Sequence, residues 1–179
     1  ILLTVVAVVV VGLGYMLYKQ FVSTPRETEA SEKLSFALTI FDEALNAPTT
    51  AQRDSLFTLS LNGDKSHGGF LQVIKDYSSS KAANVAYYSA GMAYLQLNKY
   101  KEAVTHLDKF SSEDPILSAL ALGNIGDAFV ALKQPKEAMD YYKKAIDKSD
   151  NTLTAPIYMN KAALVAEEQK NYKEALEYL

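Results

Sequence analysis

The sequence contains no cysteine, no tryptophan and only two histidines among 179 residues. Without cysteine the chain can form no disulfide, no thiolate nucleophile and no thiolate zinc ligand, so oxidising and reducing compartments are both compatible with it. A surplus of one charge is also missing, since 18 Lys and Arg stand against 21 Asp and Glu. Nucleic-acid binding requires clustered basic residues. The absence of such a cluster predicts that nucleic acid is not a partner.

Recognisable catalytic motifs are absent as well. His67 and His106 are the only side chains of the type that commonly acts as acid or base near neutral pH, and neither belongs to a His-Glu-x-x-His motif or a paired-histidine spacing. The glycine-rich segment around Gly68 lacks the Gly-Lys-Ser/Thr ending of a phosphate-binding loop. The sequence therefore predicts no enzyme activity, no cofactor and no metal site.

The amino-terminal segment is a long apolar run. Residues 1–18 read ILLTVVAVVVVGLGYMLY, and Lys19 is the first charged residue. A helix of 18 to 22 residues is about 27 to 33 Å long, which matches a hydrocarbon core of about 30 Å. A cleaved signal peptide has a shorter apolar run followed by a small-residue cleavage site. We therefore predict a transmembrane anchor over residues 1–22, with a signal peptide or a buried core segment as alternatives.

The flank after this run does not determine its orientation in the membrane, because positive and negative residues balance over residues 19–33. A connecting helix is predicted next. Thr24, Pro25 and Glu27 form a typical helix start, with the Thr24 hydroxyl as cap and Glu27 reaching back to it. Pro48 marks the end of this helix.

Residues 23–80 are interpreted as this connecting helix and a degenerate capping hairpin. Three patterns follow the connecting helix: a helical stripe over 50–61, a glycine-rich loop over 62–69 and a second helical stripe over 70–77. Helical solenoids require a terminal unit that covers the apolar side of the first repeat. The second stripe is therefore predicted to complete that terminal hairpin.

The remaining sequence is periodic. A small residue is followed twelve positions later by an alanine, and these pairs recur after 35 and then 37 residues. The three pairs are Gly91 and Ala103, Gly126 and Ala138, and Ala163 and Ala175. Small side chains allow two helices of a hairpin to approach closely, so the alanine is expected opposite the small residue. Short polar connections between the two positions indicate antiparallel helices.

These units resemble tetratricopeptide repeats, whose signature is W-x₂-L-G-x₂-Y, then A-x₃-F, then P. The first unit matches with Tyr87, Gly91, Tyr94, Ala103, Leu107 and Pro115. The second matches with Leu122, Ile125, Gly126, Phe129, Ala138, Tyr142 and Ala145. The third departs most, because Ala163 and Ala166 replace the glycine and the aromatic residue. The resemblance implies an all-α protein, with a tetratricopeptide-like α-hairpin solenoid over residues 81–179 after the transmembrane helix.

The expected repeats cover about 84–117, 119–152 and an incomplete unit at 156–179. A solenoid of this kind presents a concave surface made by the first helix of each unit. In the common frame, the predicted partner-binding residues are Val85, Tyr88, Met92, Leu95, Leu120, Asp127, Val130, Ile157, Asn160 and Leu164. Ser89 and Asn124 stand where relatives that bind chaperone tails need a cationic clamp, so such tails are not expected as ligands. Either a neighbouring helix of the chain covers this face, or a partner binds it.

A single span, a connecting helix and a small repeat domain together resemble the YfgM-type ancillary subunit of the bacterial Sec translocon. The resemblance implies a noncatalytic scaffold in the inner membrane, spanning it once, with the repeats on the periplasmic side. Its implied partners are a SecYEG-type channel, a PpiD-type membrane-anchored prolyl isomerase and translocating chains. A structural adaptor of another envelope secretion or motility complex, or a regulatory domain of a membrane signalling protein, is the alternative.

Overall fold

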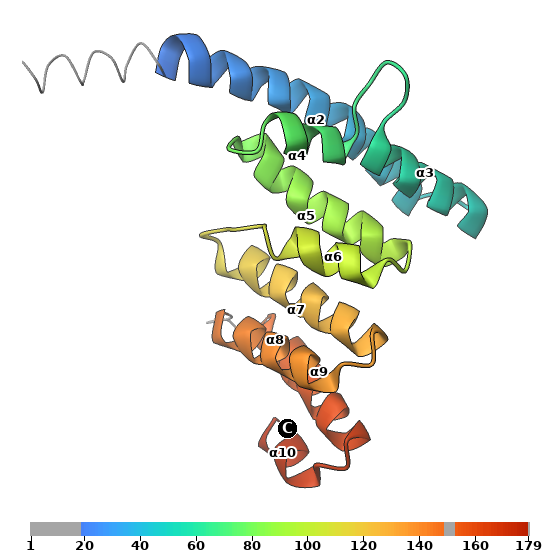
Figure 1. Ribbon diagram of the computed structural model, residues 1–179. Helices are drawn as coiled ribbons and strands as arrows, with labels where there is room; N and C mark the ends of the chain where they lie inside the picture. The colour runs from blue at the N-terminus through green and yellow to red at the C-terminus, as the bar shows by residue number, and fades with distance from the viewer. Residues whose placement is uncertain (1–18, 149–152, 179) are drawn as a thin grey trace, which may run out of the picture.

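The computed structural model describes residues 19–148 and 153–178 (Figure 1). Apart from an isolated bridge between Gly63 and Gly68, the regular structure of these residues is helical, which confirms the predicted all-α fold for this part of the chain. The elements are η1 (Lys19–Ser23), α2 (Thr24–Leu45), α3 (Thr50–Asn62), α4 (Phe70–Asp76), α5 (Lys81–Gln96), α6 (Tyr100–Leu107), α7 (Pro115–Ala131), α8 (Pro135–Lys148), α9 (Ala155–Glu168) and α10 (Tyr172–Glu177).

The predicted membrane anchor lies almost entirely outside the described residues. Of residues 1–22, the structure describes only 19–22, which belong to the π-helical turn η1. Across the part of the chain that the structure describes, no helix combines the length and the apolar character needed to span a membrane. The anchor, and the division of the chain at residues 22 and 80, stay predictions.

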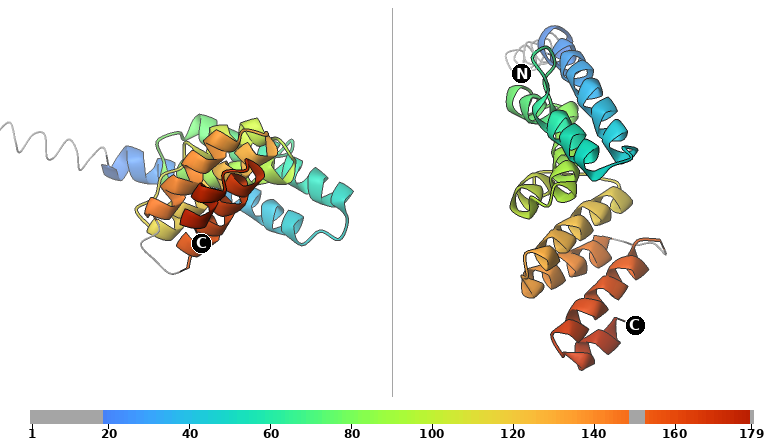
Figure 2. Two further views of the ribbon diagram at one scale, coloured as in Figure 1. Left: turned by 90° about the horizontal axis from the view of Figure 1, so that it is seen from below. Right: turned by 90° about the vertical axis from the view of Figure 1, so that its right-hand side faces the viewer.

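The helices form a single file of antiparallel neighbours. Helices α5 and α6, α7 and α8, and α9 and α10 pack as hairpins, and each hairpin also packs on the next. In the right-hand view of Figure 2 the file runs from α2 at one end to α10 at the other. This is the α-hairpin solenoid that the sequence period predicts.

The three hairpins are closed by the same turn. Asn98, Lys133 and Lys170 take positive φ values of 58°, 58° and 59°. In each turn this residue donates its N–H to the carbonyl three residues earlier, and the next residue donates to the carbonyl five residues earlier. These two bonds are those of the Schellman motif, which satisfies the last carbonyls of a helix. The three units therefore repeat in the backbone conformation of their turns as well as in sequence.

The glycine of each of the first two hairpins is covered by a large side chain. A Cβ on Gly91 would lie 2.5 Å from Cγ of Leu107, and a Cβ on Gly126 would lie 2.5 Å from Cε1 of Tyr142. The side chain nearest to each glycine is therefore a large one, and the position of the repeat alanine opposite the glycine stays a prediction. Leu107 and Tyr142 lie one turn after that alanine, and their longer side chains fill the space left by the missing Cβ.

The start of α2 also differs from its prediction. Ser23 is already helical, with φ −71° and ψ −46°, and its side chain caps nothing. The hydroxyl of Thr24 donates to the carbonyl of Lys19 at 2.8 Å. Because η1 runs directly into α2, the predicted Thr24 cap and the back-reaching Glu27 have no free helix end to satisfy, and both predictions are wrong.

Glu27 instead caps a different helix. Its two carboxylate oxygens accept the backbone N–H groups of Lys81 and Ala82 at 3.0 and 2.9 Å, while Oγ of Ser80 accepts the N–H of Ala83 at 2.9 Å. A helix begins with N–H groups that have no partner within the helix, and carboxylates are favourable there. Glu27 therefore fixes α2 to the start of the first repeat.

Two clusters of buried side chains hold the file together. The first joins α2 to α5 and includes Phe57 and Phe70, both fully buried. The ring of Phe41 meets these two rings edge-on, at centroid distances of 5.3 and 6.0 Å. The second cluster joins α7 to α10 around Tyr142 and Tyr158. The predicted capping segment thus shares one core with the first helix of the repeats.

The substitution Glu27→Ala is expected to lower the free energy of unfolding by about 1 to 2 kcal/mol, because two N–H groups of α5 lose their acceptor. Urea denaturation followed by circular dichroism measures the change in the full chain. Glu32→Ala on the exposed side of α2 is the matched control, with an expected change below about 0.5 kcal/mol. Equal losses in the two variants would contradict the capping role of Glu27.

Candidate partner-binding surface

The ten predicted partner-binding residues lie on three helices, α5, α7 and α9, and are called here the first-helix face. Its most exposed apolar side chains are Val85, Val130, Ile157 and Leu164, which are 40%, 39%, 46% and 54% exposed. Asn160 is also exposed. The half-buried members are Tyr88, Met92, Leu95, Leu120 and Asp127. The structure thus leaves the whole set accessible in part, and its binding role stays a prediction.

Side-chain contacts join the three helices of this face in order. The carboxamide of Asn124 on α7 donates to the sulfur of Met92 on α5 at 3.2 Å. The ammonium group of Lys161 on α9 pairs with the carboxylate of Asp127 on α7 at 2.6 Å. Met92 and Asp127 hold the same position in successive units, as do Asn124 and Lys161. The first-helix face is therefore continuous from α5 to α9.

The sequence analysis did not assign Lys161 to this face. A signal was present, because Lys161 occupies in the third unit the position that Asn124 occupies in the second. This is the position at which a cationic clamp needs charge. The charge of Lys161 is matched by that of Asp127 on α7, the first helix of the preceding unit, so the pair adds no net charge to the face.

Asp127 is the centre of a hydrogen-bonded cluster. One of its carboxylate oxygens accepts the hydroxyl of Tyr142 at 2.7 Å and the ammonium of Lys161 at 2.7 Å, and the other oxygen accepts Lys161 at 2.6 Å. The ring of Tyr142 stacks on that of Tyr158 at 6.2 Å. Asp127 was predicted to contact a partner, but its carboxylate already has these partners within the chain.

The two buried tyrosines predict a loss of stability at alkaline pH. Burial, and then the charge of Asp127, raise the pKa of Tyr158 to about 12. Burial also raises the pKa of Tyr142, followed by its hydrogen bond to Asp127. An unfolded tyrosine ionises near pH 10, so the unfolded state loses protons that the folded state keeps. The contribution of the two tyrosines to the free energy of unfolding is fully present below pH 10. Above pH 10 the free energy of unfolding falls by about 1.4 kcal/mol per pH unit for each tyrosine.

Urea unfolding between pH 9 and pH 12 measures this loss, and Tyr158→Phe is expected to make its slope shallower. The variant keeps the ring and removes the ionising hydroxyl. An unchanged slope in the variant would show that Tyr158 does not carry the effect.

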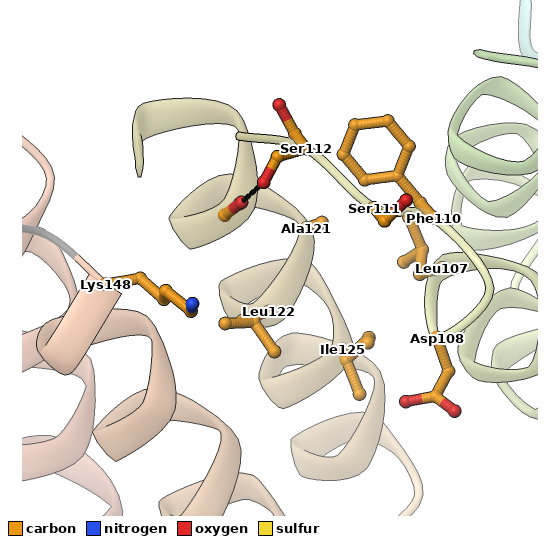
Figure 3. A pocket seen from close by; sticks show the side chains of 10 residues that line it. Leu107, Asp108, Phe110, Ser111, Ser112, Ala121, Leu122, Ile125 and Lys148 are labelled. Atoms are coloured by element: carbon orange, nitrogen blue, oxygen red, sulfur yellow. Dashed lines mark hydrogen bonds between the residues drawn. The ribbon is translucent and has the colours of Figure 1, made fainter. Parts of the chain in front are cut away.

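A separate hollow of about 240 Å³ lies beside the connection between α6 and α7 (Figure 3). Leu107, Leu122 and Ile125 line it with apolar surface, while Asp108 and Lys148 stand at different edges of it. Among residues 19–148 and 153–178, no cluster of three or more His, Asp or Glu could hold a metal ion.

Comparison with known proteins identifies the periodic region. Residues 72–152 match a family model described as tetratricopeptide repeat. Over these residues the chain is similar to tetratricopeptide repeats. A curated relative, tetratricopeptide repeat protein 23-like of Mus musculus, is 31% identical over 112 residues, which are 52% of this chain and 24% of that protein. The chain thus spans about a quarter of the length of this relative.

A solved structure titled "MamA RS-1 ArsTM double mutant" matches with a TM-score of 0.51 and 17% identity, over 82% of this chain and 90% of that chain. At this identity the likeness shows the fold alone. Tetratricopeptide repeats are scaffolds for protein–protein interaction and are typically noncatalytic.

Proposed function

We propose that this chain is a noncatalytic, membrane-tethered scaffold that binds a segment of a partner protein on the first-helix face. The observation that carries the proposal is the row of exposed apolar side chains, which includes Val130, Ile157 and Leu164, on helices held side by side. No described helix covers these side chains, which favours a partner over a neighbouring helix of the chain. Covering them would contribute about 25 cal/mol per Å² of apolar surface removed from water.

We further propose that the scaffold is an accessory subunit of the Sec translocon in the bacterial inner membrane, with the repeats on the periplasmic side. The uncharged run at residues 1–18, followed by a helix and the repeats, supports this assignment by its resemblance to the YfgM type. A SecYEG-type channel, a PpiD-type prolyl isomerase and translocating chains are the proposed partners. Tethering in the same bilayer raises effective concentration, so weak contacts on the first-helix face suffice.

Replacement of Met92 and Leu95 by glutamate tests the binding face. Both side chains are half-buried, so the folded state is expected to persist, while two new charges on an apolar face are expected to weaken partner capture at least tenfold. A photo-crosslinking residue at position 88 in intact membranes measures capture. The matched control replaces Ile116 and Leu117, which are exposed at the start of α7 and outside the face, by glutamate.

Unchanged capture in the Met92 and Leu95 variant would contradict the proposed face. An unfolded variant, seen by circular dichroism, would show that the two residues belong to the core. The Sec assignment has its own test, which is copurification from a mild detergent. Channel and isomerase subunits are expected with the full chain. Their absence would overturn the assignment, and a different envelope complex in their place would favour the structural-adaptor alternative.

A further inference from the structure

A hollow lies at the end of the first-helix face, between the α4–α5 and α6–α7 connections, and is called here the lysine hollow. It has a volume of about 540 Å³, and its lining includes Ser78, Ser79, Lys81, Val85 and Lys109. Both connections lie at the same end of α5 (Figure 1). Val85 belongs to the first-helix face and is 40% exposed. A segment bound along the face can therefore extend into the lysine hollow without leaving the surface.

The charge of the lysine hollow is unbalanced. Its lining contains Lys81 and Lys109 and no Asp or Glu. Three other hollows of the described chain each combine one lysine with one acidic residue. These pairs are Lys148 with Asp108, Lys133 with Glu168, and Lys136 with Glu174. The lysine hollow thus differs from its neighbours in carrying two positive charges that its own lining does not neutralise.

The carboxylate of Glu27 lies next to Lys81, but its hydrogen bonds are made to backbone N–H groups and not to the lysine ammonium. Glu27 uses both carboxylate oxygens to accept the N–H groups of Lys81 and Ala82. Within the described residues, the ammonium groups of Lys81 and Lys109 form no ion pair with any carboxylate. Both lysines are exposed. Their charges are therefore available to an external group.

Helix α5, which begins at Lys81, and the α6–α7 connection, which carries Lys109, are fixed to each other. The carboxamide of Asn84 donates to the carbonyl of Ser111 at 2.8 Å and accepts the N–H of Ser111 at 3.0 Å. These two hydrogen bonds hold α5 against Ser111, which lies two residues after Lys109. The separation of the two backbones is thereby set before any partner arrives, which lowers the entropy lost on binding.

We infer that the lysine hollow binds an acidic side chain of the partner segment whose apolar side chains cover Val85, Tyr88 and Met92. The inference rests on the proposed binding face and adds the chemistry of the partner, an apolar segment with Asp or Glu at one end. A carboxylate complements the unneutralised lysine charges, and the hydroxyls of Ser78 and Ser79 supply further donors. Each exposed ion pair contributes a factor of about 1.5 to 5 in affinity.

Selection from a random library of twelve-residue peptides tests the inference. The full chain is immobilised in a nonionic detergent that keeps residues 1–18 in solution. Selected peptides are expected to be enriched in apolar residues, with Asp or Glu next to them. The double variant Lys81→Gln and Lys109→Gln is expected to select apolar peptides without the acidic enrichment. The control variant Lys101→Gln and Lys136→Gln removes two exposed lysines elsewhere and is expected to keep it.

The affinity of one selected acidic peptide, measured by fluorescence anisotropy, is expected to fall about two- to 25-fold in the Lys81 and Lys109 variant, and not in the control. Apolar enrichment without acidic residues, or an equal fall in both variants, would overturn the inference and leave the binding face standing. Selection of no peptide family, with Met92→Glu and Leu95→Glu behaving as wild type, would overturn the proposed function and the inference with it.

Discussion

Gly126→Leu is expected to lower the free energy of unfolding by about 3 kcal/mol, because the substitution overpacks the second hairpin. A Cβ at this position would lie 2.5 and 2.6 Å from two ring carbons of Tyr142. That ring cannot move aside easily, because Tyr142 is 2% exposed and its hydroxyl is bonded to Asp127. The better helix propensity of leucine, about 0.8 kcal/mol relative to glycine, is too small to offset the clash.

Ala131→Leu is the matched control for this variant. Residue 131 is the exposed last residue of the same helix, so leucine adds similar bulk there without meeting a buried ring. Urea unfolding of both variants in the full chain measures the difference. If the Gly126 variant unfolded at the wild-type urea concentration, the close approach of α7 and α8 described above would be wrong.

The hairpins were predictable because their contacts are local. Gly91 and Leu107 are 16 residues apart in one hairpin, and the same spacing recurs at Gly126 and Tyr142. A spacing that repeats in sequence selects helices of fixed length and the same closing turn each time. The pattern did not reveal which side chain fills the space beside the glycine, since that depends on side-chain length and direction as well as on spacing.

Contacts between units were less visible in the sequence. Gly123 carries no repeat signature, yet a Cβ there would overlap the ring of Tyr158 on the helix of the next unit. Glu27 was assigned to its own helix start by a local rule, whereas its partners lie 54 and 55 residues later. Local rules hold only where no distant group competes, and here the free N–H groups of α5 offered Glu27 the better partners.

The candidate site divides in the same way. The repeat frame was sufficient to predict which side of α5, α7 and α9 carries Met92, Val130 and Leu164, because that side follows from helical period alone. The frame did not predict the role of Asp127. Its partners Tyr142 and Lys161 lie 15 and 34 residues away, on two different helices, and their meeting requires the stacked fold.

Asp127→Ala is expected to lower the free energy of unfolding by about 2 to 3 kcal/mol. The hydroxyl of Tyr142, a residue that is 2% exposed, would lose the only acceptor described for it, and an unsatisfied buried hydroxyl costs about 1 to 3 kcal/mol. Lys161 is 36% exposed and can turn to water, so its share is smaller. Urea unfolding measures the loss, and Asp140→Ala on the exposed side of α8 is the control.

A double-mutant cycle with Tyr142→Phe separates this structural role from partner binding. If the carboxylate mainly serves the buried hydroxyl, Asp127→Ala costs about 1 to 2 kcal/mol less in the Tyr142→Phe background than in wild type. Additive losses would show that the two groups act independently. A variant that kept wild-type stability but lost partner capture would assign Asp127 to the partner, because a carboxylate needed by the fold cannot be removed without cost to the fold.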